Sequence, residues 1–123
     1  MSDAVPRFGS VVLDCPDPLS LSEFYARLLG WPSDPEPDPA NGWASLADPA
    51  GGVMLEFQRV EDYKPPTWPA PDVPQMSHLD LRVEDLEVSH ARALEIGATH
   101  LDDGGTFRVY ADPAGHPFCL CAC

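Results

Sequence analysis

The chain repeats one order of elements, and this duplication limits its possible folds more than any other feature. Residues 10–17 and 78–85 both alternate apolar and polar side chains and both end in aspartate, and the copies start 68 residues apart. Each copy later carries the same turn, Ala-Asp-Pro-Ala-Gly, at 47–51 and 111–115. Matches at a nearly fixed spacing over several elements indicate an internal repeat. The sequence therefore predicts a tandem duplication of one unit of strand, helix and several strands.

The opening segment of each copy has the period of two that is typical of a strand with one face in a core. The apolar positions are Val11, Leu13 and Cys15 in the first copy and Leu79, Leu81 and Val83 in the second. The alternate positions are Ser10, Val12 and Asp14 in the first copy and His78, Asp80 and Arg82 in the second. These alternate positions must face solvent or a cleft.

A helix is expected after each opening strand. The first has Asp17 as N-cap before Pro18, although Ser20 with Glu23 would also make a capping box. Gly30 ends this helix. Its apolar stripe is formed by Leu21, Phe24, Tyr25, Leu28 and Leu29.

The second helix is expected to follow the cap Asp85 and to run to about Ile96, where Gly97 closes it. Its apolar stripe is weaker and is formed by Val88, Ala91 and Leu94. Further strands are expected at residues 43–47, 53–60, 99–102, 106–111 and 117–122.

The first copy is less regular than the second. Residues 32–41 contain four prolines and can hold at most an irregular edge strand. In the strand at 53–60, Leu55 and Phe57 face the core, so Glu56 and Gln58 share the polar face. The order is β-α-β-β-β twice, which gives an α+β fold class.

Residues 61–75 form a connector with five prolines, so we expect an ordered, extended crossover rather than a helix or central strand. Trp68 and Tyr63 lie in it. They could cover a cavity as an aromatic lid, which suits cations or flat rings. Alternatively, Trp68 packs on the domain surface.

Length and charge bound the class of protein. The 123 residues suit one compact domain, and because each half would be marginal alone, we expect residues 1–123 to fold as a single domain. Residues 1–7 are expected to be a loose tail. Twenty Asp and Glu against seven Lys and Arg give a net charge of −13. This charge repels nucleic acid and anionic membranes, so no partner of either kind is expected.

The cysteines indicate the compartment. Cys15 lies inside a strand, and Cys119, Cys121 and Cys123 alternate along the last one without a CxxC pair. This pattern predicts reduced thiols rather than a disulfide framework. The sequence also has no signal peptide and no apolar run long enough to span a membrane, so we expect a cytoplasmic protein.

Several motifs together carry a family resemblance. They are Phe24-Tyr25 with Leu28-Leu29-Gly30-Trp31, the strand-Asp-helix openings at Asp17 and Asp85, and the run from Asp112 to Phe118 before the last strand. In order and spacing they resemble the vicinal oxygen chelate superfamily, and more narrowly its glyoxalase-like and bleomycin-resistance-like small proteins, over residues 8–122.

The resemblance implies two βαβββ modules that form a half-open barrel around a cavity, the glyoxalase/bleomycin resistance/dioxygenase fold. Module one would span about residues 8–60 and module two about 76–122, with the connector at 61–75. A second chain commonly helps to close the cavity, and the open sheet edges of so small a chain favour the same arrangement. We therefore expect a homodimer.

The resemblance also implies where a metal would bind. In metal-using members the opening and last strands of each module supply the ligands, and the matching positions here are Ser10, Glu56, His78 and Cys119, with Gly52 taken as a bulge. Metalloenzymes of the family carry His, Glu or Gln there, so Ser10 and Cys119 depart from the pattern. A site without metal is therefore favoured, and the alternative is a divalent Zn, Fe, Mn or Ni held by Glu56, His78 and Cys119.

The cavity residues allow more than one role. Three roles are open for His78: it binds a metal, it forms a hydrogen bond with a cavity carboxylate, or it contacts a ligand directly. Asp14, Glu56 and Asp80 share this face with the cation Arg82. Either two of these carboxylates work together as acid and base, or all of them form a solvated lining. Cys119 and Cys121 face the same side and line the cavity or act as nucleophiles. The expected cavity therefore comprises Ser10, Asp14, Glu56, Gln58, Trp68, His78, Asp80, Arg82 and Cys119.

Two classes of function remain open. In the first, the protein binds a small neutral or cationic organic ligand in an acidic cavity without metal, as drug-binding members of the resembled family do. In the second, it is a metal-dependent lyase, isomerase or dioxygenase in which the metal chelates adjacent substrate oxygens. The two departures among the four ligand positions favour the first class. No catalytic residue is assigned.

Overall fold

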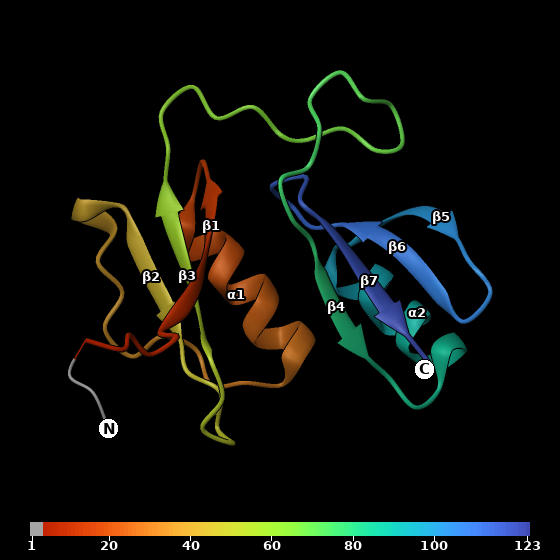
Figure 1. Ribbon diagram of the computed structural model, residues 1–123, viewed down its shortest axis with the longest axis horizontal. Helices are drawn as coiled ribbons and strands as arrows, with labels where there is room; N and C mark the ends of the chain where they lie inside the picture. The colour runs from red at the N-terminus through yellow and green to blue at the C-terminus, as the bar shows by residue number, and fades with distance from the viewer. Residues whose placement is uncertain (1–3) are drawn as a thin grey trace. The chain divides into compact units, whose positions relative to one another are not determined.

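The computed structural model describes residues 4–123, so residues 1–3 of the expected tail lie outside it. The chain divides into two compact units, one ending at Glu61 and the other running from Asp62 to Cys123 (Figure 1). The boundary falls at the start of the proline-rich connector, so the connector belongs to the second unit. The α+β class is confirmed, and folding as a single domain stays a prediction.

The first unit contains one helix packed on a three-stranded sheet (Figure 1). Its elements are β1 (Ser10–Cys15), α1 (Pro18–Leu29), the 3-10 turn η1 (Pro39–Asn41), β2 (Trp43–Leu46) and β3 (Met54–Arg59). The sheet order is β1-β3-β2, with β1 parallel and β2 antiparallel to β3. Between α1 and β2, the described residues form only η1 and an isolated bridge from Asp38 to Trp43, so the irregular edge strand is not formed there.

Local signals explain the first helix. Asp17 caps α1, because its side chain accepts a hydrogen bond from the backbone N–H of Ser20 at 3.2 Å. Gly30 ends the helix in the left-handed conformation, with φ of 69°. The apolar stripe packs as expected, and Tyr25 of α1 stacks on Phe57 of β3 with ring centroids 5.9 Å apart.

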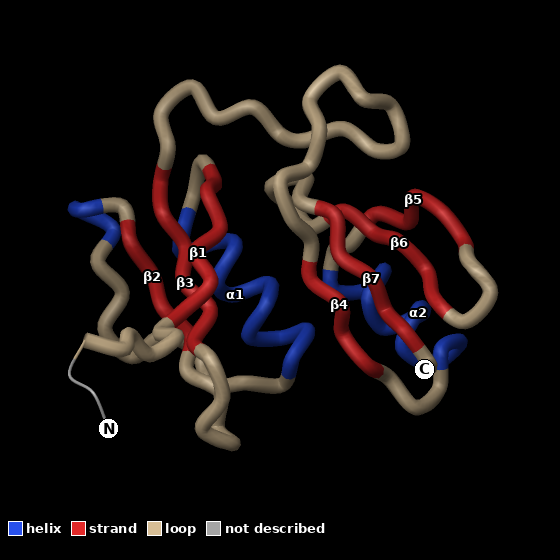
Figure 2. The backbone as a smooth tube through the Cα atoms, in the orientation of Figure 1, coloured by secondary structure: helices blue, strands red, loops and turns tan. Residues whose placement is uncertain are grey.

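The second unit has four strands and one helix (Figure 2). Its elements are β4 (Leu79–Arg82), α2 (Leu86–Ile96), β5 (Thr99–Asp103), β6 (Phe107–Ala111) and β7 (Pro117–Cys121). The sheet order is β4-β7-β6-β5, and β4 runs parallel to β7 as β1 does to β3. Asp85 caps α2 by accepting from the N–H of Val88. Among the described residues, the element order of the repeat is therefore complete in this unit and lacks one strand in the first.

The packed face of α2 differs from the expected one. Val88 and Leu94 are 65% and 42% exposed, so the expected stripe faces away from the sheet. Ala93 is the buried residue of this helix. The half-buried residues are Leu86, Ser89, His90 and Ile96. The prediction was wrong because two polar residues, Ser89 and His90, lie on the packed face and hide its helical period.

The repeated turn is built in the same way in both units. The side chain of Asp48 accepts from the N–H of Ala50 at 2.8 Å, and that of Asp112 accepts from the N–H of Ala114 at 2.8 Å. In each turn the aspartate carbonyl also accepts from the glycine N–H three residues later. Aspartate is suited to such turns because its side chain bonds the backbone two residues on.

The connector is held down by side chains. The Tyr63 hydroxyl donates to the carbonyl of Ala114 at 2.8 Å and lies 3.1 Å from His116 Nε2. Further along, the loop Thr67–Val73 is closed by a backbone hydrogen bond of 2.7 Å. The Thr67 hydroxyl donates to the carbonyl of Ala70 and accepts from the N–H of Val73. The connector is therefore ordered, as expected, but folds into a local loop rather than a plain extended crossover.

One disulfide corrects the expectation of reduced thiols. Cys121 and Cys123 are bonded, with Cα atoms 5.4 Å apart, and Cys15 and Cys119 take part in no disulfide among the described residues. The strand β7 ends at Cys121, so the chain can turn back and bring Cys123 closer than continued strand geometry would. Among residues 4–123, no helix has the length and apolar character needed to cross a membrane.

Candidate functional site

A cavity of about 400 Å³ lies within the second unit. Tyr110 of β6 points to α2, where it meets His90, so the neighbouring residues Phe107 and Val109 face the other side of the sheet, toward the cavity. The lining residues are Trp68, Gln75, His78, Asp80, Asp102, Asp103, Phe107, Val109, Pro117, Cys119 and Cys121. The floor is therefore largely apolar, with acidic and imidazole groups along it.

Three side chains at one end of the cavity could share a metal ion. One potential ligand atom from each of His78, Asp80 and Cys119 lies within 4.8 Å of the others. Strand pairing explains this cluster, because Asp80 of β4 is paired with Cys119 of β7 in the sheet. His78 Nε2 is 3.2 Å from Asp80 Oδ1, which is the carboxylate partner considered for this histidine.

The electrostatics of this cluster keep the cysteine as a thiol. Burial raises the pKa of Cys119 to about 11, and the charge of Asp80 and the hydrogen bond to it act in the same direction. A thiolate is the form that attacks electrophiles and binds metals. Near neutral pH, Cys119 is therefore a protonated thiol and a weak nucleophile, and it donates a hydrogen bond to the Asp80 carboxylate.

The connector supplies the other wall of the cavity. Trp68 and Gln75 line it, while Tyr63 is bound to the turn before β7 instead. Of the two aromatic residues considered as a lid, only Trp68 borders the cavity. Its position depends on the loop that Thr67 closes.

The structure places four expected cavity residues in the first unit. Ser10 and Glu56 lie on β1 and β3, and Asp14 is paired with Gln58 across the same strands. Arg82 belongs to the second unit, where it is exposed on β4 opposite Cys121 and does not line the described cavity. That the two sets of residues share one cavity stays a prediction.

Glu56 is held by donors of its own unit. Its Oε2 accepts from the Ser45 hydroxyl at 2.7 Å and from Trp43 Nε1 at 3.0 Å. A hydrogen bond from Ser10 is the main cause of a lowered pKa of Glu56, with Ser45 and Trp43 adding to it and burial opposing it. Glu56 is therefore a fixed, ionised carboxylate, and any metal there would compete with these three donors.

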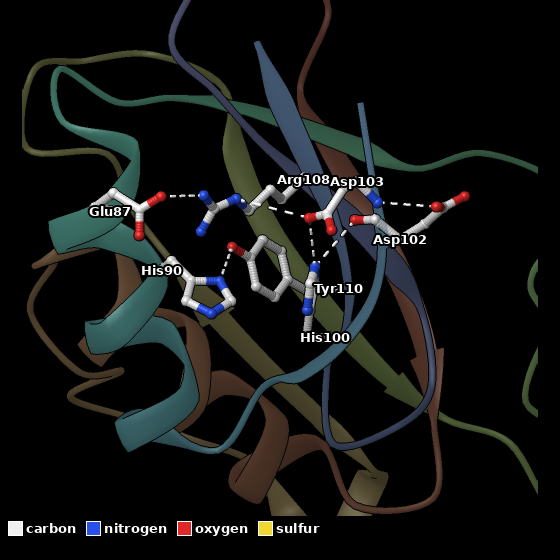
Figure 3. A network of polar contacts seen from close by, with 7 residues as sticks. All are labelled: Glu87, His90, His100, Asp102, Asp103, Arg108 and Tyr110. Carbon is white, nitrogen blue, oxygen red and sulfur yellow. Dashed lines mark hydrogen bonds and ion pairs between the residues drawn. The ribbon is translucent and has the colours of Figure 1, made fainter. Parts of the chain in front are cut away.

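A second polar network lies on the helix side of the sheet in the second unit (Figure 3). His90 Nδ1 is 2.7 Å from the Tyr110 hydroxyl, and His100 Nε2 is 2.9 Å from Asp103 Oδ1. Arg108 pairs with Glu87 of α2 and, at 3.7 Å, with Asp103. Tyr110 is fully buried, and burial is the main cause of its raised pKa.

Sequence reasoning missed part of this site. The sequence favours surface positions for His90, His100 and His116, and His100 is exposed whereas His90 and His116 are half-buried. Nothing local distinguishes Gln75, Asp102 or Asp103 from ordinary polar positions. One signal was present, because His100 and Tyr110 occupy the facing strands β5 and β6, where they are paired. The role of Gln75 depends on the path of the connector, which no short motif encodes.

The donor set fits a divalent metal in composition. An imidazole nitrogen, a carboxylate oxygen and a thiol sulfur are the ligand types that zinc accepts, and three protein ligands leave a position for substrate or water. His78, Asp80 and Cys119 would hold such an ion, and Cys119 would have to lose its proton on binding. Asp80 replaces Glu56 in this set. The described geometry therefore gives a metal-binding alternative confined to the second unit.

Comparisons with known proteins agree with this fold. A family model described as a glyoxalase-like domain matches residues 10–121. A protein from Agrobacterium tumefaciens is 20% identical, with a TM-score of 0.71 over 96% of this chain and 98% of that chain. A glyoxalase/bleomycin resistance protein/dioxygenase family enzyme from Burkholderia phytofirmans is 14% identical, with a TM-score of 0.69 over 94% of this chain and 97% of that chain.

A third solved structure was determined with a metal. The fosfomycin resistance protein FosX from Listeria monocytogenes, in complex with Mn(II) and 1S,2S-dihydroxypropylphosphonic acid, is 11% identical, with a TM-score of 0.71 over 96% of this chain and 90% of that chain. No curated protein matches the sequence. At these identities the structural likeness establishes the fold. Because the family model extends over nearly the whole chain, this protein belongs to the glyoxalase-like domain family.

Proposed function

We propose that this protein binds a small neutral or cationic organic molecule, without a metal, in the cavity of the second unit. The observation that carries the proposal is the pairing of an apolar floor, formed by Phe107, Val109 and Pro117, with the indole of Trp68. Ligand pockets are mostly apolar and aromatic, with a few polar groups that fix orientation. A ring held against Trp68 would bury apolar surface on both of its faces.

The charge of the cavity selects against anions. Asp80, Asp102 and Asp103 line it, and the described lining contains neither lysine nor arginine. An exposed ion pair contributes only about 1 kcal/mol or less, so charge would set selectivity while ring burial supplies most of the affinity.

The test uses two ligands of similar size and opposite charge. Isothermal titration calorimetry should show binding of benzyltrimethylammonium and none of benzenesulfonate. Trp68→Ala should weaken binding more than Asp14→Asn, a matched control on the other unit. Binding of benzenesulfonate as tight as that of benzyltrimethylammonium, or equal affinity of the wild type and the Trp68→Ala variant for the cation, would contradict the proposal.

The metal-dependent alternative rests on the cluster of His78, Asp80 and Cys119. With a metal there, the family's lyase, isomerase or dioxygenase chemistry would become available, because the ion would polarise adjacent oxygens of a substrate. Elemental analysis of protein purified without chelator decides between the two. One zinc, iron, manganese or nickel per chain, lost in His78→Ala but kept in Ser10→Ala, would replace the metal-free proposal.

We also propose that the protein is a homodimer. The strands β1 and β2 in the first unit, and β4 and β5 in the second, are sheet edges among the described residues. Such edges favour association with another chain. Light scattering at micromolar concentration should give twice the 13.4 kDa of the chain, and a mass near 13.4 kDa would refute the dimer.

A further inference from the structure

We propose that Trp68 and Gln75 make the cavity selective for a neutral ligand with a carboxamide-type group, which offers one hydrogen-bond acceptor and one donor side by side. The inference rests on the proposed function and names the ligand class for the same cavity. Trp68 Nε1 would donate to the carbonyl oxygen of the ligand. Gln75 Oε1 would accept from its N–H.

The first observation is that both polar atoms are closed to solvent and have no hydrogen-bond partner within the described residues. Native proteins satisfy the great majority of buried polar groups, so each exception needs a reason. Here the two exceptions are a donor and an acceptor, and both residues line the same cavity. A single ligand group of complementary polarity could satisfy both once the two side chains turn these atoms toward the cavity, because at present the atoms are closed to it.

The second observation is that the surrounding loop is otherwise well bonded. Thr67 closes the loop through Ala70 and Val73, and Tyr63 fixes the start of the connector. The unpaired atoms therefore lie in a segment that these hydrogen bonds hold in place. The terminal torsion of a glutamine is broad, so Gln75 can turn its amide toward the cavity without a change in the backbone.

The third observation is that the carboxylates of the cavity already have partners. Asp80 is bonded to His78 and Cys119, and Asp103 to His100 and Arg108 (Figure 3). Asp102 accepts from the backbone N–H of its neighbour. The buried polar atoms of the lining that have no partner among the described residues are the indole N–H of Trp68 and the amide oxygen of Gln75.

This pair discriminates between ligand classes. An ammonium group donates to Gln75 but cannot accept from Trp68. A carboxylate accepts from Trp68 but cannot donate to Gln75, and the acidic lining repels it. A carboxamide satisfies both atoms, and because these two protein atoms have no bonds to water, only the ligand loses hydrogen bonds to water on binding.

The experiment compares benzamide with acetophenone, which keeps the ring and carbonyl but lacks the N–H donor. In titrations followed by NMR of ¹⁵N-labelled protein, benzamide should bind about tenfold more tightly, the ratio expected for one additional hydrogen bond. It should also shift the indole N–H signal of Trp68, assigned through its loss in Trp68→Phe. In Gln75→Met, which keeps the length of the side chain, the two probes should bind equally.

The outcomes separate this inference from the proposed function. If both probes bind the wild-type protein equally, or if Gln75→Met keeps the preference for benzamide, the carboxamide selectivity is wrong while binding in the cavity stands. If no aromatic probe binds, both proposals fail. Should Trp68→Phe not fold, Gln75→Met alone decides, since Gln75 is only half-buried.

Discussion

The two units use the same strand register for different chemistry. In the first unit Val12 is paired with Glu56, and in the second Asp80 is paired with Cys119, so corresponding positions of the repeat meet in each sheet. The registers agree with an alignment in which Gly52 is one extra residue. The duplication therefore keeps the backbone pairing and leaves the side chains free to diverge.

The polar face of each sheet shows the result. In the first unit Glu56 is bound by Ser10, Ser45 and Trp43, so its acceptor capacity is used within the unit. In the second unit His78 and Asp80 are exposed beside a cavity that the connector borders. One copy of the repeat therefore satisfies the carboxylate on its own polar face, whereas the other presents polar side chains to a cavity.

The largest expected effect tests whether the units fold together. Phe57 and Phe118 are both fully buried and each stacks on a tyrosine. Phe57→Ala and Phe118→Ala should each cost about 3–5 kcal/mol of unfolding free energy. By calorimetry we expect one transition, lowered by either change. Two transitions, with each variant lowering only one, would show that the single-domain prediction is wrong.

A smaller effect is expected at Glu56. The Glu56→Gln variant should lose about 1 kcal/mol at pH 7, because three donors face the carboxylate. The lowered pKa means that this stabilisation is full above the ordinary value of 4.5 and is lost as pH falls below it. Chemical denaturation at several pH values should therefore show the two curves converging in acid. Asp80→Asn, on the exposed face of the second unit, should change stability less.

How far the sequence predicts this protein depends on how local each signal is. Strand alternation, the caps Asp17 and Asp85 and the repeated turn all depend on neighbours within five residues, and the structure has them as expected. The packed face of α2 does not depend on near neighbours alone, because His90 is held there by Tyr110, twenty residues away. A polar side chain that is buried against a distant partner adds nothing to the apolar period of the sequence.

The candidate site shows the same limit. Trp68 attracts notice as an aromatic residue in the connector, whereas Gln75 lines the cavity only because of the path that the Thr67 loop gives to the chain. The disulfide between Cys121 and Cys123 was missed because a regular strand was expected to its end. Each of these features requires the three-dimensional course of a loop or terminus.

The third effect concerns the network beneath the second sheet. Tyr110→Phe removes a buried hydroxyl and leaves His90 Nδ1 without that bond, so about 1 kcal/mol should be lost near neutral pH. Burial raises the pKa of Tyr110 above its ordinary value of 10. The stabilisation by the neutral hydroxyl is therefore complete below pH 10. The difference in unfolding free energy between the wild type and Tyr110→Phe should shrink as the pH rises above 10. An unchanged difference at high pH would contradict this account.

The smallest expected effect is a change in amide exchange in α2 that α1 does not show. Helix α1 buries an apolar face and has no acidic residue in its first turn, whereas α2 has Glu87 there, bound to Arg108 of β6. Glu87→Gln removes both this ion pair and a favourable interaction with the helix dipole. Amide exchange should therefore become faster in the first turns of α2 and stay unchanged in α1. Because Glu87 is 77% exposed, salt should screen the pair and reduce the difference.

Glu23→Gln, at an exposed position of α1, is the matched control. Faster exchange in α2 of that variant would mean that the effect does not arise from the contact between Glu87 and Arg108.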